Sequence, residues 1–349
     1  MGSIKVIKPG FLTTIQDLGR FGYQKFGMPV AGAMDEYALR IANLLVGNTE
    51  EEACLEITLV GPTLEFLDEC VIALTGGDLR AQINGEDLPL WQACYIQKGD
   101  KLHFGGVKSG CRAYLAVAGG LEIPAIMGSK STYLRGQIGG VEGRALWEGD
   151  EISFPALSAE TLEVVNRKVP QDYQYDFSSL IIVRVVLGPQ EDAFTLNEIK
   201  KFLEGKYQVT NNSDRMGYRL DGPRIHHKKS PDIISDGIAK GSVQIPGDGL
   251  PIVMMSDRQT TGGYTKIATI ITPDFPKIAQ AKPGDTIQFQ AVSIEEAHEV
   301  YRQYETKIRI LPDKFIYSPR QSYHCNNPFR KIINIKINGK EYLIEIEEI

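Results

Sequence analysis

The sequence has no long hydrophobic run and no excess of positive charge. No apolar segment approaches the roughly 18 residues of a membrane-spanning helix, and the opening MGSIKVIKPGF lacks the apolar stretch of a secretory signal. Lysine and arginine total 38 against 44 aspartates and glutamates, which gives a formal net charge of -6. Proteins that bind nucleic acid broadly favour a basic face, which this balance does not supply. These absences predict a cytoplasmic protein that acts on neither membranes nor nucleic acid.

Cysteine and histidine are scarce, and neither shows a site pattern. The five cysteines contain no C-x-x-C pair, and the five histidines have no ligand spacing with cysteine or glutamate. An odd set of cysteines predicts reduced thiols in the core, and a structural zinc site is not expected. The G-x-S-x-G signature of hydrolases is also missing. Gly128–Ser131 is only a fragment of a phosphate loop, which predicts a solvated turn, although its polar groups are of the kind that bind anions.

What the sequence does contain is many short apolar runs separated by turn residues, and one internal repeat. The pattern G-D-x-[LI]-x-F occurs at residues 99–104, 149–154 and 284–289. Gly-Asp makes a turn, and alternation then places the aliphatic and aromatic residues on one face of a sheet. Because the second and third copies each close a β-rich stretch, we expect two related β-barrel-like halves with a few short helices.

The expected domain boundaries follow from the repeat and from prolines that mark the ends of segments. The first barrel covers residues 1–155, a polar linker covers 156–179, and the second barrel covers 180–290. Residues 291–349 form a tail, which begins with a helix capped by Ser293 and Glu296 and ends in a hairpin turning at Asn338-Gly339. A further helix is expected over residues 192–203.

The densest group of polar residues and glycines lies between two apolar runs, at residues 235–271. Asp257 has the chemistry to hold a cation or a proton. Paired glycines at 262 and 263 let a backbone approach a ligand, and their N–H groups can line an anion pocket. A tight hairpin with polar residues in water is an equally good interpretation of this stretch.

Three other loops carry acids and amides. Asp35 stands at the start of an expected helix, where an N-cap role is the simplest interpretation and does not exclude a role in a site. Asp17 with Arg20, and Asp214 with Arg215, are most simply ion pairs that lock turns. If the two halves are pseudo-symmetric, these loops and residues 235–266 meet along one cleft.

Several long motifs resemble one family. They are PGFLTTIQDLGRFGYQ, PVAGAMDEYALRIANLLVGN, VAGG with GSKSTYLRGQIGG, SDRMGYRLDGP, and SDGIAKGSVQIPGDGLPIVMMSDRQTTGGY. They are similar to the family named after the second subunit of allophanate hydrolase, also called the biotin-dependent carboxyltransferase-like family, from about Ile4 to Phe289. The family includes the C subunit of bacterial 5-oxoprolinase, as well as the antagonist of the kinase inhibitor KipI. The resemblance implies a mainly β fold of two tandem cyclophilin-like β-barrel domains.

The resemblance also implies an activity and partners. The activity is ATP-dependent opening of the 5-oxoproline lactam to L-glutamate, in a complex with a KipI-like B subunit plus an A subunit. ATP with magnesium is the implied cofactor, whereas no covalent biotin is expected because no Met-Lys-Met lysine follows the tail hairpin. Two alternatives stay open: a regulatory protein that binds the KipI-like inhibitor, and a carboxyltransferase acting on a urea-like substrate.

On this basis the motif residues receive expected roles. Asp257 and Asp35 supply catalytic carboxylates, and Asp257 is also the position for a magnesium ion. The expected substrate-binding residues are Gln244, Gln259, Thr260, Thr261 and Tyr264, and the expected phosphate-binding residues are Gly262, Gly263, Lys266 and Arg20.

Overall fold

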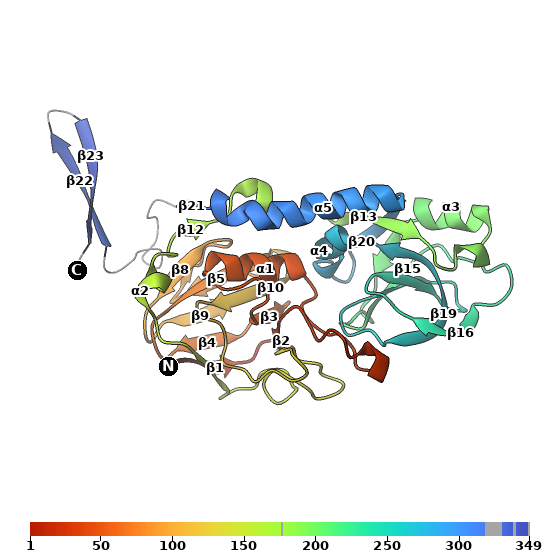
Figure 1. Cartoon of the computed structure of the whole chain (residues 1–349), viewed down its shortest axis with the longest axis horizontal. Coiled ribbons are helices and arrows are strands. Elements are labelled where there is room, and N and C mark those ends of the chain that lie inside the picture. The colour runs from red at the N-terminus through yellow and green to blue at the C-terminus, as the bar shows by residue number, and fades with distance from the viewer. Residues whose placement is uncertain (176, 318–329, 338–339, 348–349) are drawn as a thin grey trace.

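The computed structural model describes residues 1–175, 177–317, 330–337 and 340–347, and it confirms the predicted mainly β architecture with few helices (Figure 1). The chain folds into two β units that lie side by side, with one long helix across both. Among these described residues no helix is long and apolar enough to cross a membrane.

The first unit consists of two sheets that enclose one apolar core. The sheet orders are β11-β1-β4-β9-β6-β7 and β2-β3-β10-β5-β8. The strands are β1 (Gly2–Lys8), β2 (Leu12–Gln16), β3 (Cys54–Thr58), β4 (Thr63–Phe66), β5 (Cys70–Asp78), β6 (Ala81–Ile83), β7 (Glu86–Asp87), β8 (Ala93–Ile96), β9 (Lys101–Phe104), β10 (Ser109–Val117) and β11 (Glu151–Phe154). Alternate residues of β1 are buried, so Ile4 and Val6 point into the core beside Leu64 and Phe66 of β4.

The second unit is a closed barrel. Its strands follow the order β13-β20-β14-β15-β18-β17-β19, and pairing of β19 with β13 closes the ring, while β16 adds to β19 outside it. The strands are β13 (Leu180–Leu187), β14 (Tyr207–Val209), β15 (Gly217–Asp221), β16 (Asp232–Gly237), β17 (Ser242–Ile245), β18 (Ile252–Met254), β19 (Thr261–Ile270) and β20 (Thr286–Ala291). Closure leaves no free edge among these seven strands and holds their connecting loops in fixed positions.

The helices join and cover the two units. They are α1 (Glu36–Leu45), α2 (Ala159–Leu162), α3 (Leu196–Glu204), α4 (Phe275–Ala279) and α5 (Ile294–Ile310), with 3-10 turns at Gln24–Phe26, Gln171–Tyr173, Glu191–Ala193, Thr272–Asp274 and Leu311–Lys314. The helix expected over residues 192–203 begins later, because Thr195 caps it by accepting a hydrogen bond from the Glu198 N–H. Ser293 caps α5 in the same way, through the Glu296 N–H.

Helix α5 returns from the second unit and covers α1 of the first (Figure 1). Ile308 and Leu311 are fully buried in the cluster that α1 forms with the outer face of its sheet. Arg40 of α1 donates two hydrogen bonds of 2.8 Å to the Glu305 carboxylate. Residues 157–175 also pack on this face, where Val164 and Val165 are buried. The connection and the tail helix therefore complete the first unit.

The tail ends in a two-stranded sheet of β22 (Arg330–Ile337) and β23 (Lys340–Glu347), after the short strand β21 (Ile316–Tyr317), which pairs with β12 (Arg167–Lys168). The antiparallel register from Arg330↔Glu347 to Ile337↔Lys340 confirms the predicted hairpin, and its turn at 338–339 lies outside the described residues. Cys325 also lies outside them, whereas the other four cysteines are buried free thiols.

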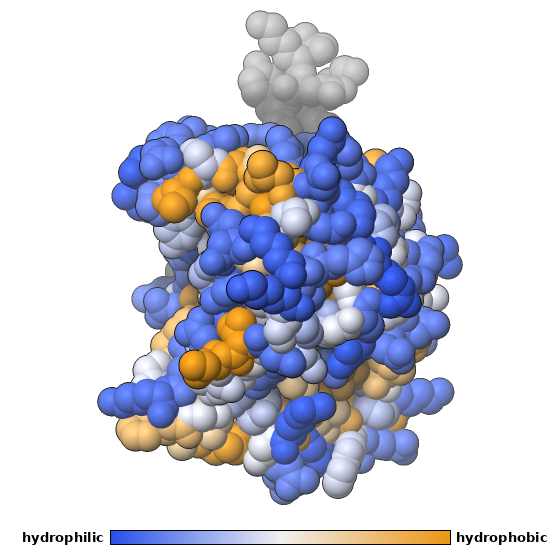
Figure 2. All heavy atoms as spheres, turned by 90° about the vertical axis from the view of Figure 1, so that its right-hand side faces the viewer, coloured by the Kyte–Doolittle hydropathy of each residue, from blue (hydrophilic) through white to orange (hydrophobic). Residues whose placement is uncertain are grey.

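The end of the molecule formed by the second barrel is largely hydrophilic, with apolar patches that are separate from one another (Figure 2). Exposed apolar side chains in the second unit include Leu196 of α3 and Ile234 of β16. Single exposed apolar residues are normal on a protein surface. The buried polar residues described next lie instead between the two units.

We expect Ile308→Ala to lower the free energy of unfolding by about 2–5 kcal/mol, because it leaves a cavity under a fully buried side chain. Ile310→Ala is the matched control, since the Ile310 side chain is 37% exposed on the same helix. Urea denaturation of both variants measures the difference. Equal losses for the two variants would show that α5 does not anchor the first unit.

Candidate functional site

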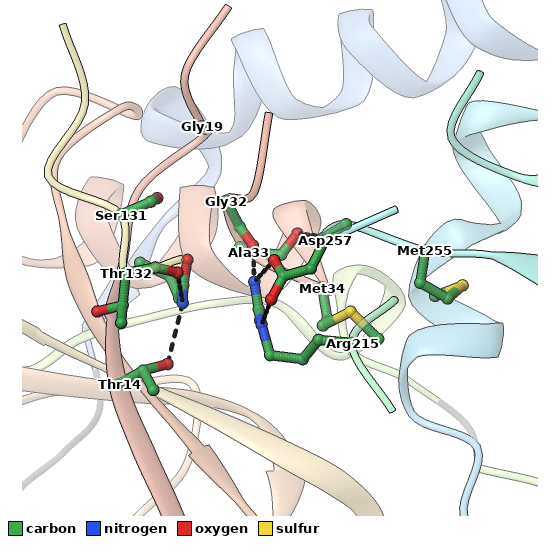
Figure 3. A network of polar contacts seen from close by, with 12 residues as sticks. Thr14, Gly19, Gly32, Ala33, Met34, Ser131, Thr132, Arg215, Met255 and Asp257 are labelled. Atoms are coloured by element: carbon green, nitrogen blue, oxygen red, sulfur yellow. Dashed lines mark hydrogen bonds and ion pairs between the residues drawn. The ribbon is translucent and has the colours of Figure 1, made fainter. Parts of the chain in front are cut away.

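A loop before α1 lies between the two units and contacts both (Figure 3). Its residues Gly32 to Asp35 come from the first unit. The Arg215 Nη2 donates to the Gly32 carbonyl at 2.6 Å, and the Ser256 hydroxyl donates to the Ala33 carbonyl at 2.9 Å. Gly32 has a φ of +84°, and a Cβ there would lie 2.7 Å from the Leu18 carbonyl oxygen, so the turn requires glycine.

Arg215 joins the units through two carboxylates. It donates to both oxygens of Asp257, at 3.1 and 3.0 Å, and its Nη1 donates to Glu56 of strand β3. All three side chains are buried. Burial alone would raise the pKa of the Glu56 carboxyl, but the charges of Arg215 and Arg112, together with hydrogen bonds from the Met34 N–H and the Tyr114 hydroxyl, lower it overall. The prediction that Arg215 forms an ion pair with Asp214 is wrong: the Asp214 carboxylate instead accepts the Met216 and Gly217 N–H groups.

The same polar network extends to Asp35. The Tyr114 hydroxyl donates to Glu56 Oε2 at 2.7 Å and accepts a hydrogen bond from the Asp35 N–H at 2.8 Å. The Asp35 carboxylate accepts the Ala38 N–H as the cap of α1, as predicted, and also the Tyr175 hydroxyl and the Gln280 side-chain amide at 2.6 and 2.7 Å. Burial raises the pKa of Asp35 to about 6, against the opposing effect of these donors.

Arg20 is also fully buried, and it contacts residues 126–131 of the first unit. Its Nε donates to the Ile126 carbonyl and its Nη2 to the Ser131 carbonyl, at 3.0 and 2.8 Å. Nη1 has no partner among the described residues. Burial lowers the pKa of Arg20, and the negative charges of the Asp17 and Asp257 carboxylates oppose that change.

The loop at residues 129–131 already holds an anion, the carboxylate of Asp17. The Ser129 hydroxyl, the Lys130 N–H and the Ser131 hydroxyl all donate to it, the first two at 2.7 and 2.6 Å. The predicted solvated turn is therefore wrong, because Ser129 and Ser131 are buried. Asp17 has no ion pair with Arg20 in the described part of the chain, contrary to prediction, and this loop gives no phosphate site while Asp17 fills it.

A second group of predicted residues gathers in the barrel of the second unit. A Cβ placed on Gly262 would lie 3.0 Å from Gln244 Nε2 and 3.5 Å from Gln259 Nε2, so both amides surround this glycine. Gln244 is 2% exposed, and its Nε2 has no partner among the described residues. A buried amide donor without an acceptor is costly. This donor therefore suits a carbonyl or carboxylate oxygen of a small ligand.

Lys266 lies next to Gln244 across the β17–β19 pair and is buried. Its ammonium group makes an ion pair of 2.9 Å with Asp236, which is itself more than half exposed. Lys266 lowers the pKa of the Asp236 carboxyl. An exposed aspartate is a partner that a stronger anion can displace.

The prediction of a loop at Gly262 and Gly263 is wrong. Gly262 and Gly263 lie within strand β19, where β16 pairs with Gly262, and neither has a positive φ. Their N–H groups are therefore not arranged as an anion nest. The other expected residues remain near by: the Thr260 carbonyl accepts a hydrogen bond from the Ile238 N–H, Thr261 begins β19, and Tyr264 is 41% exposed.

The described residues do not fit a magnesium ion at Asp257. Both of its oxygens bond to the Arg215 guanidinium, and the nearest acidic partner in the network, Glu56, shares that cation. The described chain contains no group of three or more His, Cys, Asp or Glu side chains that could hold a metal. Hard cations such as magnesium need free carboxylate oxygens.

Sequence reasoning missed Glu56, Arg112 and Tyr114, and treated Arg215 as a turn residue. A signal was present, because Glu56 and Arg112 are charged residues in the middle of apolar strands. Charged residues are rarely buried without a partner. Two opposite charges in two such strands predict a buried pair, and indeed they lie 4.0 Å apart.

Replacing Arg215 with methionine should lower the free energy of unfolding by about 3–5 kcal/mol, because Glu56 and Asp257 lose their shared buried cation. Adding Glu56→Gln and Asp257→Asn removes the uncompensated charges, so the triple variant should recover part of the loss. Denaturant titration measures both. A triple variant less stable than Arg215→Met would contradict this account.

The raised pKa of Asp35 predicts a specific pH dependence. Between about pH 4 and pH 6 the folded protein holds a proton on Asp35 that the unfolded chain has lost. The stability that wild type has relative to Asp35→Asn should therefore fall as pH rises through this window, by about 3 kcal/mol, and then stay constant. Unfolding measured at several pH values checks this. A flat difference between pH 4 and 6 would overturn it.

Comparisons with known proteins agree on one family. The family profile described as carboxyltransferase domain, subdomain A and B, matches residues 26–291. The chain is 40% identical over 296 residues to the 5-oxoprolinase C subunit of Escherichia coli, covering 84% of this chain and 93% of that protein. It is 37% identical to the 5-oxoprolinase C subunit of Haemophilus influenzae, covering 86% and 96%. The urea amidolyase of Saccharomyces cerevisiae is 34% identical, and the match covers 88% of this chain but 18% of that protein.

Solved structures show the same fold. The urea amidolyase of K. lactis superposes with a TM-score of 0.83 at 32% identity, covering 90% of this chain and 21% of that chain. The protein TTHA0988 superposes with a TM-score of 0.74 at 33% identity, covering 83% and 56%. The profile match extends over most of both units, and the two 5-oxoprolinase relatives are matched along nearly their whole length. The chain therefore belongs to the carboxyltransferase-domain family, as the motifs of its loops predicted.

Proposed function

We propose that this chain is the C subunit of an ATP-dependent 5-oxoprolinase complex that opens 5-oxoproline to L-glutamate. The observation that carries the proposal is the match to two proteins named as the C subunit of 5-oxoprolinase, along 93% and 96% of their length. The name of these relatives implies further subunits. The partners we propose are a KipI-like B subunit plus an A subunit, with ATP and magnesium as cosubstrate.

A lactam is a poor electrophile, so the proposed reaction first makes its oxygen a leaving group. Transfer of the γ-phosphoryl group from ATP to the lactam oxygen gives ADP and a phosphorylated ring. Water then adds to the ring carbon, and the C–N bond breaks as nitrogen takes a proton. A second water releases phosphate from the resulting acyl phosphate and leaves glutamate. Phosphoryl transfer and the release of phosphate build negative charge on oxygen, which fixed donors stabilise.

The two units offer such donors. Arg20 Nη1 and Gln244 Nε2 are buried donors with no partner among the described residues. Lys266 holds an ion pair with an exposed aspartate. In the proposal Gln244, Gln259, Thr260, Thr261 and Tyr264 orient the substrate, and Lys266 with Arg20 stabilises anionic oxygen. Asp257, fixed by Arg215, and Asp35, which holds a proton below about pH 6, supply carboxylates.

Carboxyl transfer to a urea-like substrate is the second candidate. It is favoured by the description of the family and by urea amidolyase relatives at 34% and 32% identity. Those relatives are far longer than this chain, which matches 18% of each. This activity would need biotin on a carrier domain.

The buried free thiols at four cysteines suit a reducing compartment, and we propose the cytoplasm for either activity.

The decisive assay mixes this chain with its proposed KipI-like partner and the A subunit, then follows ATP and glutamate. We expect glutamate release coupled to ATP loss, and neither when this chain or 5-oxoproline is omitted. Absence of turnover, together with a complex that relieves KipI-like inhibition of a kinase, would overturn the enzymatic proposal in favour of a regulatory role.

Asp257→Asn in the assembled complex should lower kcat by about a hundredfold or more, if the charge of Asp257 supports the transition state. Asp313→Asn is the matched control, because Asp313 is exposed in the turn after α5. Circular dichroism on both variants separates misfolding from a catalytic loss. Full turnover by a folded Asp257→Asn complex would remove Asp257 from the catalytic residues.

A further inference from the structure

A cavity of about 400 Å³ lies between the two units, beside α4. Three segments line it: residues 108–110 at the start of β10, residues from 175 to 182 before and within β13, and residues from 276 to 285. None of Arg20, Arg215 and Asp257 lines it. This volume falls within the range of about 300–1,000 Å³ that small-molecule sites occupy.

The wall of this cavity is largely apolar and partly aromatic. Phe177 and Tyr175 lie edge to face with ring centroids 5.5 Å apart, and Pro276 lines the cavity with them. Leu180 and Ile182 of β13 also line it, and they are 38% and 47% exposed. Branched and aromatic side chains exposed inside a concave surface suit the apolar body of a ligand.

The rim of the cavity carries one positive charge in excess, in a chain that is acidic overall. Lys108, Lys277 and Lys282 line it, but Lys108 is paired with Asp78 and Lys282 with Asp285, each at 2.9 Å. Lys277 is 3.0 Å from Asp274, but the Asp274 carboxylate is already held by Arg184 through bonds of 2.9 and 2.7 Å. Lys277 is therefore a surplus cation, and its side chain is about half exposed.

The back of the cavity contacts the buried network. Tyr175 and Gln280 both line the cavity, and both donate to the Asp35 carboxylate. The Gln280 side-chain carbonyl oxygen also accepts the Cys111 and Arg112 N–H groups at 3.0 and 2.9 Å. A molecule in the cavity would thus touch Tyr175 and Gln280, the two side chains that hold the Asp35 carboxylate. It would not touch Arg20 or Asp257, which do not line the cavity.

We propose that this cavity is a second binding site, for an organic anion with an aromatic body and one carboxylate or phosphate group. The ring would lie against Phe177, Leu180 and Pro276, and the anionic group would lie near Lys277. An aryl carboxylate and a nucleotide share this chemistry, and the test below distinguishes them. The proposal does not depend on the proposed oxoprolinase activity, because it uses the isolated chain and direct binding.

Tryptophan fluorescence can report binding, because the chain has two tryptophans. Trp91 lies edge to face with Tyr175 at 5.3 Å, and Trp147 is 61% exposed. In Trp147→Phe protein the signal therefore comes from Trp91 alone. We expect saturable quenching or enhancement on titration with phenylacetate or with AMP, and whichever binds more tightly identifies the class. Isothermal titration calorimetry gives an independent Kd.

The variant Lys277→Gln should raise that Kd by about fivefold, as expected from one partly exposed charge contact. Lys200→Gln is the matched control, since Lys200 lies on α3 with a side chain 71% exposed. It should leave the Kd unchanged. The proposal is overturned if neither compound binds at millimolar concentration, or if Lys277→Gln and the control bind equally well.

Discussion

The structure depends on one cation, the guanidinium of Arg215, buried between two carboxylates from different halves of the chain. Arg215 and Asp257 come from the second unit, whereas Glu56 and the Gly32 carbonyl come from the first. Taking these charges out of water costs free energy that their attraction only partly returns. These charges therefore mainly fix how the two units are oriented, since any other arrangement of the units would leave a buried charge unpaired.

Much of the architecture could be predicted from local patterns in the sequence. Alternating apolar residues and Gly-Asp turns indicated strands, Asp35 and Ser293 indicated helix starts, and Asn338-Gly339 indicated a hairpin. These signals work because each depends on neighbours in the chain. The motifs also led to the correct family. The glycine pair at 262 and 263 failed as a loop signal because pairing with β16 extended the strand through it.

The interior of the site could not be predicted in the same way, because its contacts join distant residues. The loop at 129–131 has the composition of an anion-binding turn, and only the fold shows that Asp17 supplies the anion. Arg215 has an aspartate next to it in the sequence, yet its partners are Glu56 and Asp257. The sequence identifies the chemical groups, but only the fold shows which of them have partners and which, like Gln244 Nε2, have none among the described residues.

Helix α5 has a consequence for the order in which the protein is made. Ile308 and Leu311 complete a cluster whose other members lie on α1, on the first unit's sheet and in residues 157–175. A ribosome synthesises those other members long before it reaches α5. During that interval the outer face of α1 remains uncovered. The first unit therefore exposes an apolar surface until α5 is synthesised. Domains usually fold in sequence as they leave the ribosome. Here the first unit is synthesised first and completed last, so nascent chains that stop before residue 308 expose this apolar surface to solvent.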